Sequence, residues 1–240
     1  MNSSIIRFVL GYVLKVEAVL MLLPCIVAVL YQERTGFAYL LVAAIAMTLG
    51  TLMTIRRPKN YVFYLKEGCV ATALSWIFLS FFGALPFWIS GEIPSLIDAL
   101  FETVSGFTTT GSSILSDVEA LSHCALFWRS FTHWIGGMGV LVFLLAVIPL
   151  SGGSHINLMR AESPGPSVGK LVPKIKYTAQ ILYVIYLGMT VVEIILLLIS
   201  RMPVFDAITL SFGTAGTGGF GIKGDSIASY TALQQWIITI

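Results

Sequence analysis

The chain has 240 residues, of which 57% are hydrophobic and only 11% are charged, and its formal net charge is +2. Soluble domains carry roughly 25% charged residues, so this composition excludes a soluble globular domain and predicts an all-α protein solvated by lipid. Disordered, collagen-like and disulfide-rich chains are excluded by the same numbers, and so small a net charge gives no reason to expect nucleic-acid binding.

Apolar segments long enough to span a membrane recur along the chain, since a helix needs about 20 residues to cross the hydrocarbon core. The first one is too long for a signal peptide and lacks its cleavage site, and it is interrupted by Lys15 and Glu17. We expect spans at Ile5–Leu30, Phe37–Ile55, Gly68–Ser90, Ala125–Leu150 and Tyr177–Ser200, with the opening turns of a sixth before Ile240.

Basic residues are distributed unevenly between the two sides of this five-span arrangement. One side has nine of them, namely Arg7, Arg56, Arg57, Lys59, Lys66, Arg160, Lys170, Lys174 and Lys176. The other has three, namely Arg34, Arg201 and Lys223, while Lys15 and Arg129 fall within or beside spans. Because cytoplasmic loops carry the excess of Lys and Arg, we expect the side with nine, and the N-terminus, to be cytoplasmic.

The cysteines and histidines give no indication of a metal site. The cysteines lie far apart within apolar stretches, which predicts a buried small side chain at each of Cys25, Cys69 and Cys124. The histidines share no metal-ligand spacing, and we expect an interfacial or helix-packing role for each of His123, His133 and His155.

Two segments are neither spans nor ordinary loops, and they are copies of each other. Residues 94–113 and 203–221 each open with proline, continue as an amphipathic stretch too short to span, and run into Gly, Thr and Ser. Positions that differ by 108 match in the two segments, as Gly111 and Gly219 do. We therefore expect an internal repeat of span, short helix, Gly/Thr loop and span, with both copies in the same orientation.

The Gly/Thr loops are expected at membrane depth, where non-helical backbone survives only if protein buries it or if it lines an aqueous path. Glycine lets carbonyl oxygens turn towards one axis, threonine adds hydroxyl oxygens, and rings of such oxygens replace the hydration shell of a monovalent cation. The C-terminal ends of the short helices add partial negative charge. We expect a selectivity filter at Thr109, Thr110, Gly111, Thr217, Gly218 and Gly219, with the ion at Thr110, Gly111, Gly218 and Gly219.

Other interpretations of these segments stay open. Each loop could be a mere extracellular turn, and Gly216-x-Gly218-x-x-Gly221 formally matches a dinucleotide fingerprint, although it follows a short helix rather than a strand. Asp98 and Asp206 lie near the starts of the short helices, where capping explains them better than catalysis does. Glu102 either attracts cations at the outer mouth or has a packing or hydrogen-bonding role.

The fourth expected span carries a pattern of its own between Phe127 and Gly139. Trp128 and Trp134 suit the outer membrane interface, and Arg129 either snorkels outward or holds an acidic neighbour. The glycines near its end permit either a close helix approach or a bend: Gly136, Gly137 and Gly139.

Together these motifs resemble the Trk/Ktr/HKT superfamily of potassium transporters, and within it the TrkH-type membrane subunits. The resemblance covers essentially the whole chain, and the two spans before the first repeat favour the Trk branch over the Ktr branch. The motifs that carry it are Phe101–Gly111, Trp128–Gly139, Met159–Pro166, and Phe205–Ile208 leading into Thr217–Phe220.

The resemblance implies a transporter rather than an enzyme, in which four repeats surround one filter and each contributes one glycine. Gly111 and Gly219 match the first two of these glycines. It also implies a bacterial inner-membrane location, potassium as the transported ion without a covalent cofactor, a homodimer within membrane lipid, and a cytosolic nucleotide-binding regulatory subunit of the TrkA type. The basic segment Arg160–Lys176 is a candidate contact for that subunit or for anionic lipid. Coupling to protons or sodium, as in a symporter, stays open.

On this basis we expect two N-terminal spans in residues 1–60, a first repeat in 61–155, a cytoplasmic linker in 156–176 and a second repeat in 177–240 that stops at the start of its last helix. Half of the contributors cannot close a ring of oxygens. The alternatives are therefore a non-conducting truncated fragment or half-subunit, and a secondary transporter of a small solute. The last is less favoured because both loops follow helix C-termini, which suit a cation.

Overall fold

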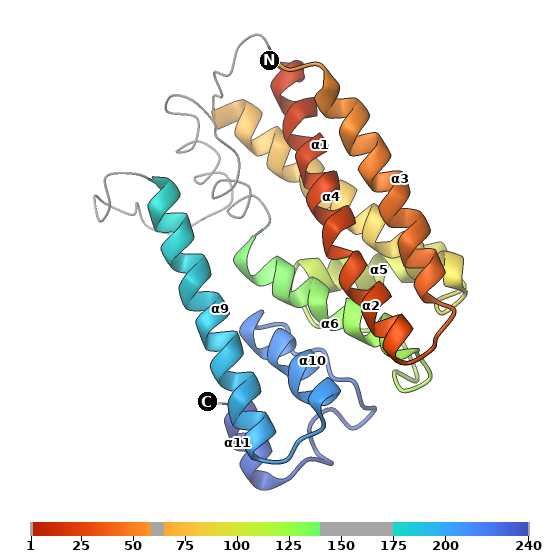
Figure 1. Cartoon of the computed structure of the whole chain (residues 1–240), viewed down its shortest axis with the longest axis vertical. Coiled ribbons are helices and arrows are strands. Elements are labelled where there is room, and N and C mark those ends of the chain that lie inside the picture. The colour runs from red at the N-terminus through yellow and green to blue at the C-terminus, as the bar shows by residue number, and fades with distance from the viewer. Residues whose placement is uncertain (1, 59–64, 140–174, 240) are drawn as a thin grey trace.

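The structure is a computed structural model that describes residues 2–58, 65–139 and 175–239. Every regular element in these ranges is a helix (Figure 1), which confirms the all-α prediction. The helices are α1 (Ser3–Leu20), α2 (Leu22–Leu30), α3 (Gly36–Ile55), α4 (Leu65–Ser90), α5 (Leu96–Phe107), α6 (His123–Met138), α9 (Ile175–Ile199), α10 (Val204–Ala215) and α11 (Ala232–Thr239).

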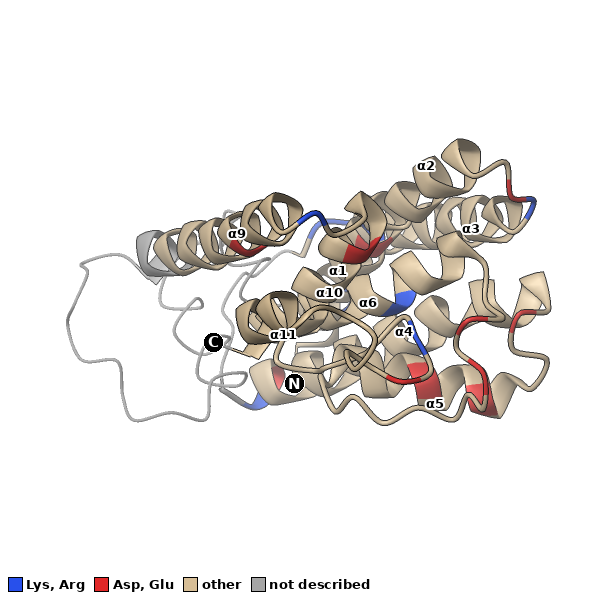
Figure 2. Cartoon of the chain, turned by 90° about the horizontal axis from the view of Figure 1, so that it is seen from below, with Lys and Arg blue, Asp and Glu red and all other residues tan. Residues whose placement is uncertain are grey.

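Within the described ranges, four helical segments are long and apolar enough to cross a membrane: Ser3–Leu30, Gly36–Ile55, Lys66–Ser90 and Gln180–Ile199. They confirm four of the five expected spans. The remaining one, Ala125–Leu150, begins as α6, and the part beyond Gly139 lies outside the described residues. Figure 2 shows that charged residues are sparse along the helices, as a lipid environment requires.

The first span is broken at Met21, which separates α1 from α2. Pro24 explains the break, because proline lacks the amide that would bond the carbonyl of Leu20 and its ring crowds that carbonyl. Within α1, Lys15 turns to α3 and donates from Nζ to Oγ1 of Thr54 at 2.6 Å.

Helices α1 and α3 cross at close range through two glycines. A Cβ on Gly11 would stand 2.9 Å from the carbonyl oxygen of Gly50, and a Cβ on Gly50 would stand 2.6 Å from the carbonyl oxygen of Gly11. Small residues at such crossings let helix backbones approach closely, which is a main source of helix association in lipid. This crossing holds α1 and α3 together.

Helix α6 lies at the centre of the described structure and packs against α2, α5 and α10 (Figure 1). Its Trp128 is fully buried and donates from Nε1 to the carbonyl oxygen of Gly83 at 3.0 Å. The prediction that Trp128 lies at the outer interface is therefore wrong, because the indole N–H finds its partner inside the protein. Trp134 is half-buried and donates to Oγ1 of Thr190 in α9 at 3.1 Å.

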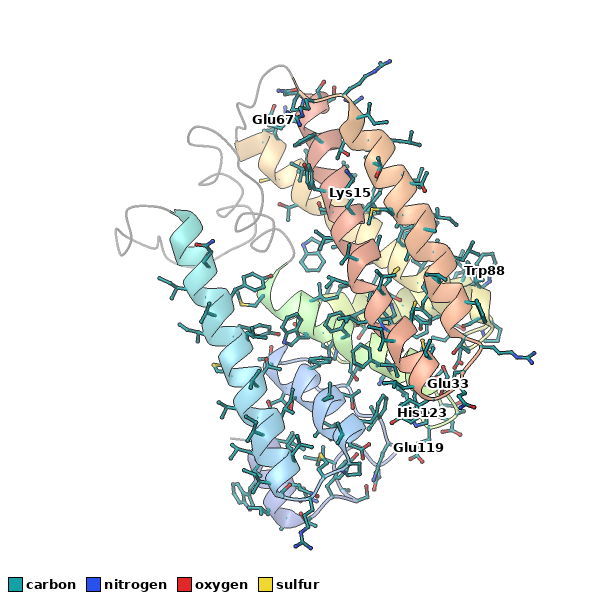
Figure 3. The ribbon with its side chains drawn as sticks, viewed as in Figure 1. Lys15, Glu33, Glu67, Trp88, Glu119 and His123 are labelled. Atoms are coloured by element: carbon teal, nitrogen blue, oxygen red, sulfur yellow. The ribbon has the colours of Figure 1, made fainter. Side chains whose placement is uncertain are left out.

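The start of α6 is capped from the turn between α2 and α3. The carboxylate of Glu33 accepts hydrogen bonds from the backbone N–H groups of His123 and Cys124, both at 2.9 Å, and faces Nδ1 of His123 at 2.9 Å. Figure 3 shows Glu33 and His123 next to each other. The His123 ring also stacks on Tyr31 at 3.9 Å, so this histidine has the helix-packing role that we expected.

Replacing Glu33 with alanine is expected to lower the free energy of unfolding in detergent by about 1–2 kcal/mol, because it removes the cap on two backbone donors. Thermal unfolding followed by circular dichroism measures this. Arg34→Ala is the control, since Arg34 is an exposed neighbour in the same turn. Equal losses in the two variants would show that the carboxylate does not act as a cap.

The three cysteines differ in their surroundings. Cys124 is buried and Cys25 is half-buried, but Cys69 is exposed on α4. The prediction of a buried side chain is wrong for Cys69. A helix solvated by lipid has no need to bury a small apolar side chain inside the protein.

Candidate functional site

Two short helices, α5 and α10, lie on either side of α6 in the sequence and both pack against it. Each has 12 residues, and their first residues, Leu96 and Val204, are 108 positions apart. Asp98 and Asp206 lie in the first turns, where a negative charge is stabilised by the helix dipole. Asp206 also accepts a hydrogen bond from the Tyr230 hydroxyl at 2.9 Å.

The chain leaves the two helices with the same backbone conformation. Thr109 and Thr217 have φ of 54° and 57°, and Gly111 and Gly219 have φ of 76° and 77°. A threonine with positive φ is an outlier because its branched side chain crowds the backbone. Such strain, about 1–3 kcal/mol per residue, persists only where the surroundings impose it and is typical of functional sites.

The backbone hydrogen bonds that close the two helices are also equivalent. Thr110 N–H donates to the carbonyl of Ser105 at 2.9 Å, and Gly218 N–H donates to the carbonyl of Gly213 at 3.0 Å. The two loops, residues 108–112 and 216–220, are therefore structural copies. We call them loop 1 and loop 2.

The loops contact each other. The Cα of Gly111 packs against the carbonyl oxygen of Gly218, which occupies the place that a Cβ on Gly111 would take. The equivalent side of Gly219 is open, with no heavy atom of the described residues within 4 Å of where a Cβ would stand. Loop 1 thus meets loop 2 head to tail, since equivalent glycines have different surroundings.

The candidate filter residues present oxygens at a partly open surface. Thr110, Thr217 and Gly219 are exposed, and the other three are half-buried: Thr109, Gly111 and Gly218. The hydroxyls of Thr108 and Thr110 lie 2.8 Å apart. Neutral carbonyl and hydroxyl oxygens beside two helix C-termini suit a monovalent cation.

A buried ion pair lies behind the loops. Glu102 of α5 and Arg129 of α6 are 1% and 3% exposed, and the Nε atom of Arg129 donates to Glu102. Glu102 also accepts from the Ser113 hydroxyl at 3.0 Å and from the Ile114 N–H at 3.0 Å, just after loop 1. Of the alternatives open for these residues, the structure selects hydrogen bonding for Glu102 and an acidic neighbour for Arg129.

Arg129 also reaches the end of loop 2, a contact that the sequence did not predict. Its Nη1 donates to the carbonyl of Gly221 at 2.7 Å, and its guanidinium carbon lies 3.6 Å from the centre of the Phe220 ring. The Phe220 ring also stacks on the buried His133, at 4.0 Å between centres. The sequence did indicate that Arg129 has partners within the protein, because an arginine in an apolar span rarely remains unpaired in a membrane.

The glycines at the end of α6 allow a close approach rather than marking a bend within the described helix. A Cβ on Gly136 would overlap the carbonyl of Phe107 at the end of α5, and a Cβ on Gly137 would stand 2.7 Å from the Cα of Gly216 in loop 2. Gly139, with φ of 71°, follows the last described turn of α6. The backbones of Phe107 and Gly216 thus pack directly on α6 at these two glycines.

Other features considered in the sequence either lack the required structural context or lie outside the described residues. The fingerprint at Gly216, Gly218 and Gly221 follows helix α10, which rules out the strand-to-helix context that dinucleotide binding requires. His155, the motif Met159–Pro166 and nearly all of the basic segment Arg160–Lys176 lie outside the described residues.

Comparison with known proteins identifies a family and several relatives that match this chain. A family described as "TrkH: Cation transport protein" matches residues 35–240. The Trk system potassium uptake protein TrkH of Salmonella typhimurium is 37% identical over 235 residues, which cover 96% of this chain and 48% of the relative. TrkG of Escherichia coli is 34% identical over 236 residues, which cover 96% and 49%.

A solved structure is similar over almost the whole chain. The crystal structure of the potassium transporter TrkH from Vibrio parahaemolyticus superposes with a TM-score of 0.82 at 30% identity, covering 99% of this chain and 48% of that one. The chain therefore spans about half the length of the relatives that it matches.

Proposed function

The chain belongs to the TrkH family of cation transport proteins, and from this premise we propose that it takes part in potassium uptake across a bacterial inner membrane. In this proposal, loops 1 and 2 supply half of a selectivity filter, with potassium held at Thr110, Gly111, Gly218 and Gly219. The membrane potential drives the ion inward, and coupling to protons or sodium is left to experiment.

The observation that carries the proposal is the direct contact between two copies of one strained loop. Loops 1 and 2 share positive φ values at equivalent residues, and the Cα of Gly111 touches the carbonyl oxygen of Gly218. Strain that both copies share, placed where the two loops touch, supports a common ligand rather than two independent turns. Carbonyl and hydroxyl oxygens in such a ring favour a dehydrated monovalent cation.

The open side of Gly219 supports a filter that further loops complete. Head-to-tail contacts form a ring only if the last loop meets the first. Since the relatives are about twice as long as this chain, further repeats of the same kind are the proposed neighbours of Gly219 on one side and of Thr110 on the other.

The remaining features of the proposal come from the resemblance and from charge. The N-terminus is proposed to be cytoplasmic, because of the excess of basic residues on that side. A homodimer and a TrkA-type regulatory subunit are proposed partners, with Arg160–Lys176 as a candidate contact. The proposal also includes the six filter residues and the repeat boundaries given above.

Two alternatives make different predictions. A half-subunit that does not conduct by itself would insert into the membrane but support no uptake until joined to two more loops. A secondary transporter of a small organic solute would transport its substrate regardless of potassium. The placement of both loops after the C-terminal ends of α5 and α10 supports the cation, because those ends carry partial negative charge.

The test is rubidium uptake in a potassium-uptake-deficient bacterial strain. One arm expresses the chain alone, and a second arm expresses a hybrid in which the chain replaces the corresponding half of Salmonella typhimurium TrkH. We expect the hybrid to restore growth at low potassium and rubidium uptake in preference to sodium. If neither protein transports rubidium although both are inserted at normal abundance, the proposed function is wrong. Uptake by the chain alone would instead contradict the half-subunit alternative.

A further inference from the structure

The buried ion pair of Glu102 and Arg129 contacts equivalent positions after the two loops. Glu102 accepts a hydrogen bond from Ser113, and Arg129 donates one to Gly221. Ser113 and Gly221 are 108 positions apart, as the two loops are. The pair therefore extends from the chain that leaves loop 1 to the chain that leaves loop 2. It links the two copies in addition to the contact of Gly111 with Gly218.

The second repeat does not have an equivalent pair. The residues 108 positions after Glu102 and Arg129 are Leu210 and Ile237, which are both apolar. Leu210 is buried in a small apolar cluster with Leu197 and Met202. The charged group that contacts Gly221, directly after loop 2, is thus the arginine of the first repeat.

Arg129 also limits the freedom of loop 2 through Phe220, the residue after Gly219. The Arg129 guanidinium lies over the Phe220 ring, and His133 stacks on the same ring. The Phe220 backbone N–H also donates to Nδ1 of His133 at 3.5 Å. Glu102 compensates the positive charge of Arg129, which would otherwise repel cations from a nearby filter. The ion pair therefore controls both the position of loop 2 and the net charge near the proposed filter.

We propose that Glu102 and Arg129 are positioning residues that set the spacing of loops 1 and 2, and that they thereby tune ion selectivity without touching the ion. The effect on selectivity rests on the proposed function, whereas the mechanical coupling of the loops does not. The first repeat thus supplies the anchor for the loop of the second.

Hydrogen–deuterium exchange of the purified chain in lipid nanodiscs tests the coupling without any need for transport. Arg129→Lys keeps a charge beside Glu102 but loses the planar fork that reaches Gly221 at the same time. We expect exchange in residues 216–222 to become about tenfold faster, as expected for local opening, while residues 108–114 change little. Glu102→Gln is expected to accelerate both segments, because Ile114 loses a charged acceptor and Arg129 loses its anchor.

The double variant Glu102→Gln/Arg129→Gln guards against misfolding, since it leaves no unpaired buried charge. It is expected to accelerate exchange in both loop segments and to leave α5, α6 and α10 protected. Glu119→Gln is the matched control, because Glu119 also links the two repeats, by accepting from the Gly224 N–H at 3.0 Å, but at the exposed surface. This control is expected to leave both loop segments as they are.

Two results would overturn the inference. One is unchanged exchange in residues 216–222 of Arg129→Lys. The other is equal acceleration across α5, α6 and α10 in every variant, which would mean that the pair only holds the helices together. In the hybrid transporter, Arg129→Lys should also lower the ratio of rubidium to sodium uptake at normal abundance. A hybrid without uptake would count against the proposed function, while the exchange data would still decide the coupling.

Discussion

Replacing Gly111 with alanine is expected to destabilise the chain more than the same replacement of Gly219. Both glycines have φ near +76°, a conformation that costs an L residue about 1–2 kcal/mol, so this cost is common to the two variants. Only at Gly111 does the new Cβ also overlap the carbonyl oxygen of Gly218. Overpacking against backbone adds about 1–3 kcal/mol, because a carbonyl cannot rotate away as a side chain does.

The measurement is the thermal unfolding of the two purified variants in the same detergent, followed by tryptophan fluorescence. Their difference isolates the contact between loop 1 and loop 2, since the conformational cost cancels. Equal destabilisation would mean that the loops do not touch in solution. In the hybrid transporter, Gly111→Ala is further expected to weaken the preference for rubidium over sodium, because it displaces the Gly218 carbonyl. Unchanged ion preference would contradict the assignment of Gly111 to the filter.

Replacing Gly136 with alanine is expected to lower the free energy of unfolding by about 1–3 kcal/mol. The physical reason is the backbone contact between α6 and the end of α5, where a Cβ would overlap the carbonyl oxygen of Phe107 and lie 2.8 Å from its carbon. Helix α6 has to move away from α5 to accommodate the methyl group. Loop 1 begins directly after Phe107, so the same variant is expected to reduce uptake by the hybrid.

Gly188→Ala is the matched control for this variant. Gly188 also lies in a helix, α9, but no other part of the described chain lies within 4 Å of where its Cβ would stand. Alanine has the higher helix propensity, so this change is expected to be neutral or to stabilise by up to about 1 kcal/mol. Opposite signs for the two variants would confirm the close approach at Gly136. A loss of similar size in both would show that glycine is needed for another reason.

The membrane character, the helical spans and the copied loops were predictable from the sequence because each depends on local chain properties. Lipid offers no hydrogen bonds to the backbone, so every long apolar segment must be a helix. The copies are visible as matching residues 108 positions apart, and the structure gives those residues the same φ values, as at Gly111 and Gly219. The ion-binding role of the loops stays a prediction.

Other features required the spatial arrangement of segments that are far apart in the chain. Trp128 was expected at the membrane interface, because aromatic residues are enriched there, but its partner Gly83 lies 45 positions earlier and brings it inside. The contact of Arg129 with Gly221 spans 92 positions, and an arginine in an apolar span predicts a partner within the protein but not which residue it is. Cys69 was misplaced because sequence hydrophobicity does not distinguish lipid from protein as the apolar surroundings.

The sequence by itself thus determined what each segment is: a lipid-solvated helix, a short half-helix, or a Gly/Thr loop rich in oxygen. These properties follow from apolar length, proline, and glycine, which act within a few residues. Only the tertiary structure decided how the segments meet, with Gly111 against Gly218 and one ion pair behind both loops. Packing depends on the shapes of surfaces that hydrophobicity alone does not distinguish, so the spacing of the loops is a property of the whole fold.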